Sequence, residues 1–260
     1  FIGFTGNKNI TAASIAIKLP FLFYLLLTSK KNIFVILTSF ISFFAFCLIF
    51  FLKARSVFLS FSFVLFLFFS ASFFLKKYRS LFILPLLVLS FLFVSLLTTK
   101  QSNPVLNDIK SINFSAASSS DRFLLWDNAL SYIIEHPFVG CGIGNWKIES
   151  LPYWNTHLSG YVVPYHAHND FLELTAELGL FGGLTYLIFF LALFYALFSL
   201  LYRFRENPFM FFQIVVLFAS LSVYTIDALL NFPFERPRQQ IIFALLVSII
   251  MLLNKRKKFI

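Results

Sequence analysis

Residues 180–202 read LFGGLTYLIFFLALFYALFSLLY and contain no charged side chain. A helix of roughly 20 mostly apolar residues crosses a bilayer core of about 30 Å, so this run predicts a transmembrane helix. Six further runs have a similar composition: about 10–27, 32–52, 56–75, 80–97, 208–226 and 239–253. The sequence therefore predicts an all-α, polytopic integral membrane protein with six or seven transmembrane helices.

The composition of the 260-residue chain supports the membrane class. Hydrophobic residues make up 59% and charged residues 12%, and the mean hydropathy is +0.85. Average soluble proteins contain roughly 45–50% apolar and about 25% charged residues. A net charge of +10 could indicate a nucleic-acid partner. The positions of the charges argue against it, and we expect membrane lipids rather than nucleic acid as the surroundings.

Basic residues predict the orientation of the chain, because short cytoplasmic loops collect Lys and Arg. If every span crosses once, four basic clusters lie on one side: 30–31, 76–79, 203–205 and 255–258. This side is predicted to be cytoplasmic, with the N-terminus of this segment outside and the C-terminus inside.

The same topology predicts the division of the chain. Helices 1–4 of a membrane bundle lie in 1–97, and helices 5–7 with a basic cytoplasmic tail lie in 180–260. Residues 98–179 form a large, partly helical outer loop region, which we expect to pack on the bundle.

Two short outer connections go against the orientation rule, because Lys53 and Arg55 lie in one and Arg236 and Arg238 in the other. Such residues either bind an anionic partner or extend their charged ends to lipid headgroups. Topology alone leaves both interpretations open.

The polar stretch HAHND at 166–170 directly precedes a helical pattern. Asn169 is a good helix N-cap, Asp170 and Glu173 fall in the first turn where anions are favoured, and Gly179 interrupts or ends the helix. His168 then lies at the mouth of a helix beside the membrane surface. It is either a solvated interfacial histidine or part of a site.

The polar residues His157, His166, His168 and Asp170 could be drawn as a metal cluster. Histidines two apart point in different directions, and the helix-borne spacing typical of zinc sites is absent. We therefore expect no metal.

A second helix is predicted from Asp121 to about Glu135, because apolar residues recur there at helical spacing. Arg122 and Trp126 are four residues apart and share a face. The helix is expected to stop at Pro137.

The loop GCGIG at 140–144 invites a phosphate-binding interpretation. It follows no strand of a βαβ unit and lacks the Lys-Ser/Thr ending of a P-loop. A turn that brings its backbone close to another segment is the favoured interpretation.

These stretches together resemble a known family. DRFLLW at 121–126, HPFVGCGIGNW at 136–146 and HNDFLELTAELGLFGG at 168–183 occur in the order and spacing of the O-antigen ligase and O-antigen polymerase superfamily of bacterial inner-membrane glycosyltransferases. GNKN at 6–9 and KARS at 53–56 are similar to two further elements of that family. Its members have additional spans, so this sequence is expected to be the C-terminal part.

The resemblance implies transfer of a glycan from an undecaprenyl diphosphate carrier to an acceptor at the periplasmic face, without a nucleotide sugar, metal or other cofactor. Arg55 and Arg122 would then bind the diphosphate, and His168 would serve the acceptor hydroxyl as a base or an orienting group. Guanidinium groups suit a leaving diphosphate, and histidine is the usual base near neutral pH. Asn169, Asp170, Glu173 and Trp126 are candidates for orienting or acceptor-site residues.

The resemblance leaves the acceptor open. Lipid A core, a growing glycan chain and a protein hydroxyl would make the enzyme a ligase, a repeat-unit polymerase and a protein O-glycosyltransferase, respectively. A non-catalytic lipid-glycan transporter is the alternative from a different class. That alternative predicts ionisable residues paired within the spans. The sequence instead concentrates them in outer loops and at span mouths.

Overall fold

The structure is a computed structural model that describes residues 7–74, 83–98, 117–153 and 165–255. Every regular element within these ranges is a helix. The basic residues at 76–79 and 256–258, the loop 99–116 and His157 lie outside the described residues.

Among the described residues, six helical segments are long and apolar enough to cross a membrane. The first is formed by α1 (Lys8–Ala16) and α2 (Leu19–Thr28) together, and the others are α3 (Asn32–Leu52), α4 (Arg55–Phe74), α9 (Asp170–Arg203), α10 (Pro208–Leu230) and α11 (Pro237–Lys255). A seventh apolar helix, α5 (Ile83–Thr98), is shorter. The prediction of an all-α polytopic membrane protein is confirmed.

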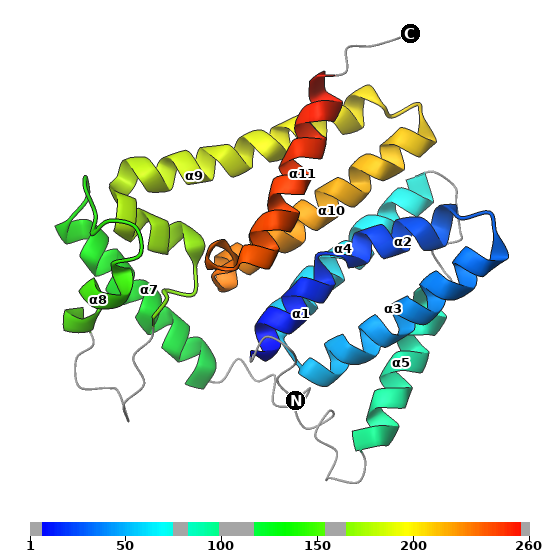
Figure 1. The fold of residues 1–260 in the computed structure, drawn as a ribbon, viewed down its shortest axis with the longest axis horizontal. Helices are drawn as coiled ribbons and strands as arrows, with labels where there is room; N and C mark the ends of the chain where they lie inside the picture. The colour runs from blue at the N-terminus through cyan, green and yellow to red at the C-terminus, as the bar shows by residue number, and fades with distance from the viewer. Residues whose placement is uncertain (1–6, 75–82, 99–116, 154–164, 256–260) are drawn as a thin grey trace. The chain divides into compact units, whose positions relative to one another are not determined.

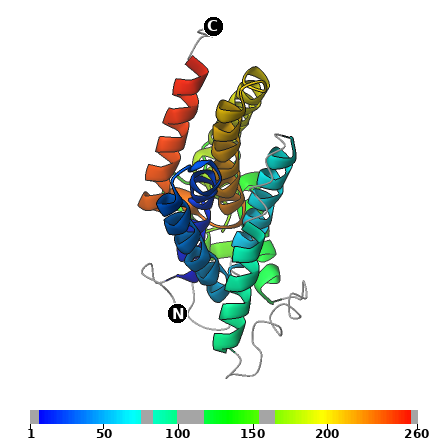
Figure 2. The ribbon, with the colours of Figure 1, turned by 90° about the vertical axis from the view of Figure 1, so that its right-hand side faces the viewer.

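The chain forms two compact units. Unit 1 comprises residues 1–110, 194–226 and 241–260, and unit 2 comprises residues 111–193 and 227–240. Within unit 1, α3 packs against α1, α2 and α5, and α1 also contacts α4 (Figures 1 and 2).

Phenylalanine side chains form much of the interior of unit 1. The Phe23 ring meets Phe46 and Phe68 edge to face, at centroid distances of 5.8 and 5.3 Å, and Phe68 meets Phe212 at 5.4 Å. Edge-to-face pairs add about 0.5–1.5 kcal/mol beyond the area they bury. These phenylalanines therefore have a packing role that the sequence alone did not indicate.

Unit 2 contains α7 (Ala117–Glu135), the short helices α8 (Trp146–Glu149) and η2 (Leu151–Tyr153), and the first part of α9. It also contains the connection between α10 and α11, which includes η3 (Pro233–Glu235). The predicted helix over 121–135 is confirmed at its end, and it begins a turn earlier. All the polar residues that converge near His168 belong to this unit.

The long helix α9 is sharply bent near its start (Figure 1). Gly179 has φ 71° and ψ −179°, which no helical residue adopts, and it divides α9 into a short first part and a long apolar second part. The predicted interruption at Gly179 is confirmed. The first part carries the polar residues, and the second is the apolar run 180–202.

Candidate functional site at the start of α9

The loop that follows α7 satisfies the backbone groups that the bend in α9 leaves open. A break in a helix leaves carbonyls without partners before it and N–H groups without partners after it. Cys141 N donates to Ala176 O at 3.0 Å, Gly142 N donates to Glu177 O at 2.8 Å, and Leu180 N donates to Pro137 O at 2.8 Å. The loop and the break are thus one hydrogen-bonded structure.

Two glycines allow this close approach. A Cβ atom on Gly140 would lie 2.5 Å from Ala176 O, and one on Gly179 would lie 2.3 Å from Phe138 O. Both residues also have positive φ, 67° and 71°, which glycine adopts without strain. The loop 140–144 brings its backbone close to another segment, as predicted, and that segment is α9.

Glu177 joins the loop to the interior of unit 2. Its Oε1 accepts hydrogen bonds from Gly144 N at 2.8 Å and Trp146 N at 3.4 Å. The indole of Trp146 is fully buried and packs against Tyr132 of α7. The hydrogen bonds of Glu177 and the packing of Trp146 on Tyr132 join α7, α8 and α9. The start of α9 therefore has a fixed position within unit 2.

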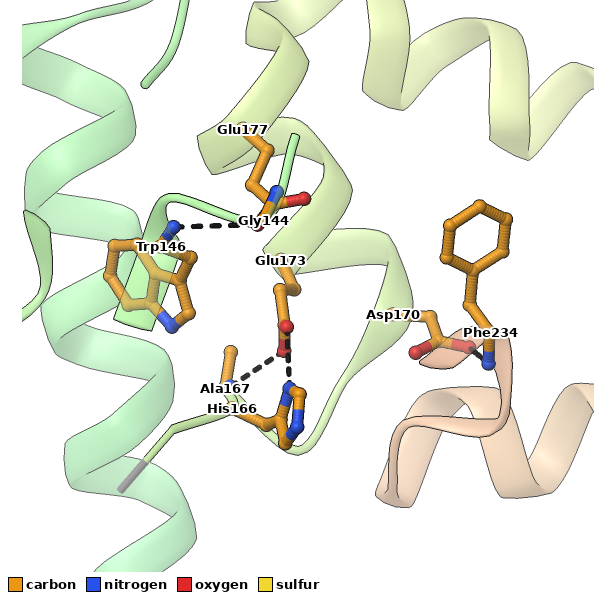
Figure 3. A network of polar contacts seen from close by, with 8 residues as sticks. All are labelled: Gly144, Trp146, His166, Ala167, Asp170, Glu173, Glu177 and Phe234. Carbon is orange, nitrogen blue, oxygen red and sulfur yellow. Dashed lines mark hydrogen bonds and ion pairs between the residues drawn. The ribbon is translucent and has the colours of Figure 1, made fainter. Parts of the chain in front are cut away.

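The first turn of α9 has the predicted cap. The Asn169 side chain accepts hydrogen bonds from Phe171 N at 3.0 Å and Leu172 N at 3.2 Å, so it is an N-cap. The Asp170 side chain points toward the α10–α11 connection, where its Oδ2 accepts a hydrogen bond from Phe234 N at 3.0 Å (Figure 3). Asp170 therefore ties the α10–α11 connection to the start of α9.

Glu173 holds the segment just before α9. Its carboxylate lies 2.8 Å from His166 Nδ1, and its other oxygen accepts from Ala167 N at 2.8 Å (Figure 3). The side chain of Glu173 is only 9% exposed, whereas that of His166 is 26% exposed. Glu173, considered above as an orienting group for His168, hydrogen-bonds His166.

Three cationic or ionisable groups meet at the ring of Phe232. The His166 imidazole is stacked on it at a centroid distance of 4.0 Å, and the His168 imidazole meets it nearly edge-on at 5.1 Å. The guanidinium carbon of Arg236 lies 4.4 Å from the same centroid. Phe232 therefore gathers both histidines and an arginine into one cluster.

Arg236 is held in that cluster by an acidic partner. Its Nη1 lies 3.4 Å from Asp227 Oδ2, and Asn231 Nδ2 donates to Asp227 Oδ1 at 2.7 Å. Arg236 and Asp227 are both buried, at 6% exposure. Breaking such a pair by removing one partner leaves a buried charge, which is strongly destabilising.

His168 is strained in its backbone and neutral in its side chain. Its φ of 53° is left-handed, which is uncommon for a residue other than glycine. Burial lowers the pKa of the imidazole to about 4, helped by the charges of Arg122, His166 and Arg236, while Asn231 acts in the opposite direction through a hydrogen bond. His168 is therefore uncharged at neutral pH.

The lowered pKa predicts how stability depends on pH. The unfolded chain, with a histidine pKa of about 6.5, binds more protons than the folded chain between about pH 6.5 and 4. The contribution of His168 to stability is therefore present above pH 6.5 and is lost as the pH falls toward 4. We expect the unfolding midpoint of purified protein in detergent to fall less over this range in His168→Asn. Asparagine tolerates left-handed φ. If the unfolding midpoint falls by the same amount between pH 7 and pH 4 in His168→Asn and in wild type, the role of His168 is contradicted.

The remaining predicted site residues lie in different places. Arg122, on α7 in unit 2, is close enough to His168 for its charge to act on the imidazole. Trp126 packs edge to face on Phe123 at 5.6 Å and lines an open hollow of about 500 Å³ along α7. Arg55, the first residue of α4, is exposed and belongs to unit 1. The charge of Arg122 thus acts on His168 within unit 2, whereas Arg55 belongs to unit 1.

Sequence reasoning missed the contribution of the α10–α11 connection. In the sequence, Arg236 stands out only as a charge that goes against the orientation rule. No motif or spacing in the sequence singles out Phe232 or Asn231. Within the described ranges, no group of three or more His, Cys, Asp or Glu side chains could hold a metal ion.

The fold and the site define a polytopic α-helical membrane protein with a polar, arginine-flanked histidine cluster at the mouth of a broken helix. The sequence model of the O-antigen ligase family matches residues 40–187. This range covers more than half of the chain and includes α7, the glycine loop and the start of α9. The chain belongs to the O-antigen ligase family. No curated protein matches the chain.

Family membership points to glycan transfer of the O-antigen ligase type by a membrane glycosyltransferase-like enzyme. It implies a lipid-linked glycan donor and a glycan acceptor. Together with the apolar helices, it indicates a bacterial inner-membrane protein.

Proposed function

We propose that the protein transfers a glycan from undecaprenyl diphosphate to an acceptor hydroxyl at the periplasmic face of the inner membrane, as an O-antigen ligase without a metal or other cofactor. The observation that carries this proposal is the neutral imidazole of His168 beside the charge of Arg122 at the start of α9. An uncharged imidazole can accept a hydrogen bond from a hydroxyl, and a guanidinium can bind an anion.

On the donor side, the reaction requires a place for negative charge. The bond between the anomeric carbon and the diphosphate breaks, and its electron pair leaves with the diphosphate. Fixed guanidinium groups stabilise such developing charge, and arginine does so bidentately. Arg122 and Arg55 fill this role in the proposal.

On the acceptor side, the hydroxyl must be held with its oxygen directed at the anomeric carbon. A general base is most effective when its pKa is close to the working pH. The pKa of about 4 makes His168 a weak base, so of its two expected roles the hydrogen-bonding one is favoured. His168 then orients the acceptor, and Asn169 caps the helix that presents it.

The test is transfer of a labelled glycan from undecaprenyl diphosphate in proteoliposomes containing the full-length protein. Wild type is expected to transfer the glycan to lipid A core in the presence of EDTA, and His168→Ala is expected to lose about 10²-fold or more of kcat/KM. Full activity in His168→Ala would refute the role of His168. Product on the growing carrier-linked glycan would make the protein a polymerase, and product on serine or threonine a protein O-glycosyltransferase. Movement of the intact carrier-linked glycan without a new glycosidic bond would make it a transporter.

A further inference from the structure

The pair formed by His166 and Glu173 has no role in the proposal so far. One carboxylate oxygen of Glu173 lies within hydrogen-bond distance of His166 Nδ1, at 2.8 Å. The other oxygen accepts a hydrogen bond from Ala167 N at 2.8 Å. A carboxylate that binds one ring nitrogen sets the tautomer and leaves the other nitrogen as the acceptor. In the described part of the chain, Nε2 of His166 has no hydrogen-bond partner.

The exposure of the pair suits a group that exchanges protons with water. The side chain of His166 is 26% exposed, while that of Glu173 is 9% exposed and therefore shielded. The oriented imidazole is thus accessible from one side and anchored from the other. Catalytic bases in enzymes are often arranged in this way, with a further side chain that orients the base.

The pair lies beside the proposed acceptor position. His166 and His168 touch the same Phe232 ring, at centroid distances of 4.0 and 5.1 Å. The charge of His166 also contributes to the low pKa of His168. A hydroxyl held by His168 is therefore close to His166, either directly or through one water molecule.

We propose that His166, oriented by Glu173, is the general base that removes the proton of the acceptor hydroxyl, while His168 only holds that hydroxyl. This inference rests on the proposed glycan transfer. His166 would be a catalytic residue and Glu173 a positioning residue.

The step balances in atoms and charge. The acceptor oxygen forms a bond to the anomeric carbon of the donor, and the bond from that carbon to the diphosphate breaks. The hydroxyl proton moves to His166 Nε2, and the electron pair of the broken bond leaves with the diphosphate. The imidazolium formed on His166 is stabilised by the Glu173 carboxylate and then loses its proton to water.

Other charges around the pair affect its pH dependence. Glu173 faces His166 directly, and Asp170 and Glu177 lie near Glu173 on the same helix. Arg236 lies against Phe232, and Arg122 acts on the neighbouring His168. Among the described residues, Glu173 is the one member of this group that hydrogen-bonds His166, so its substitution is the most direct perturbation.

The experiment measures kcat/KM from pH 5 to pH 9 for full-length protein in proteoliposomes. His166→Ala is expected to lose about 10²- to 10⁴-fold of kcat/KM at pH 7, the usual contribution of a general base. Added imidazole should restore part of that activity, which a misfolded protein could not show. His166→Gln can still donate a hydrogen bond to Glu173 but cannot take the proton, so it should also remain inactive.

Glu173→Gln keeps an oxygen for Ala167 N but removes the charge that stabilises the imidazolium. We expect the acid limb of its pH profile to move to lower pH and its kcat/KM to fall about 10-fold or more. His136→Gln is the matched control: His136 is exposed at the end of α7 against Tyr132, and its replacement should leave the profile unchanged.

The outcomes separate the two proposals. Wild-type activity and an unmoved pH profile in His166→Gln would overturn the assignment of His166 while leaving glycan transfer intact. Absence of rescue by imidazole in folded His166→Ala would also count against it. Absence of transfer by the wild-type protein would overturn the proposed function and this inference together.

Discussion

Arg122→Ala is expected to lower kcat/KM for glycan transfer by about 10²- to 10³-fold, the usual effect of removing one group that stabilises developing negative charge. The charge of Arg122 helps to lower the pKa of His168, which is the basis for assigning its guanidinium to the donor site. Arg122→Lys keeps the charge but loses the planar, bidentate geometry, and we expect it to recover only part of the activity.

The transfer assay in proteoliposomes measures this effect, and Arg205→Ala is the control. Arg205 is about half exposed, pairs with Glu206 at 3.7 Å and belongs to unit 1, whereas the histidine cluster belongs to unit 2. Its replacement should leave the rate unchanged. Equal rates in Arg122→Ala and wild type would remove Arg122 from the donor site.

Gly179→Ala is expected to destabilise the protein by about 2–5 kcal/mol. A left-handed φ costs a residue with a Cβ roughly 1–2 kcal/mol. The new Cβ would also lie 2.3 Å from Phe138 O, so the loop must move and the hydrogen bond from Leu180 N to Pro137 O would be strained or lost. Leu180 belongs to a helix that is apolar enough to cross a membrane, and an N–H without a partner in such surroundings costs about 1–3 kcal/mol more.

Thermal unfolding in detergent measures the loss, and Gly144→Ala provides a matched control. Gly144 also has a positive φ, 77°, but no atom lies within 4 Å of a Cβ built there. Gly144→Ala should therefore lower the free energy of unfolding only by the backbone cost of about 1–2 kcal/mol. Equal unfolding midpoints for the two variants would contradict the close approach of the loop to α9.

The bend at Gly179 links stability to the site. It separates the polar first part of α9, which carries Asp170, Glu173 and Glu177, from the apolar run that spans the membrane. The loop from α7 supplies hydrogen-bond partners for the broken backbone. The same elements that allow the break therefore also fix the segment carrying His166 and His168.

The sequence by itself determined the membrane class, the helical fold and most of the spans. These follow from local properties, because a run of about 20 apolar residues has few ways to satisfy its backbone in a bilayer except as a helix. The N-cap at Asn169, the interruption at Gly179 and the close backbone approach of the glycine loop were predicted for similar local reasons.

Only the tertiary structure decided which polar groups meet. Glu173 and His166 are seven residues apart, and their pairing depends on how the chain turns before α9. Arg236 and Phe232 reach the histidines from a connection more than 60 residues away along the chain, so no spacing rule could relate them. Periodicity specifies which face of a helix a side chain occupies, whereas long-range packing chooses its partner.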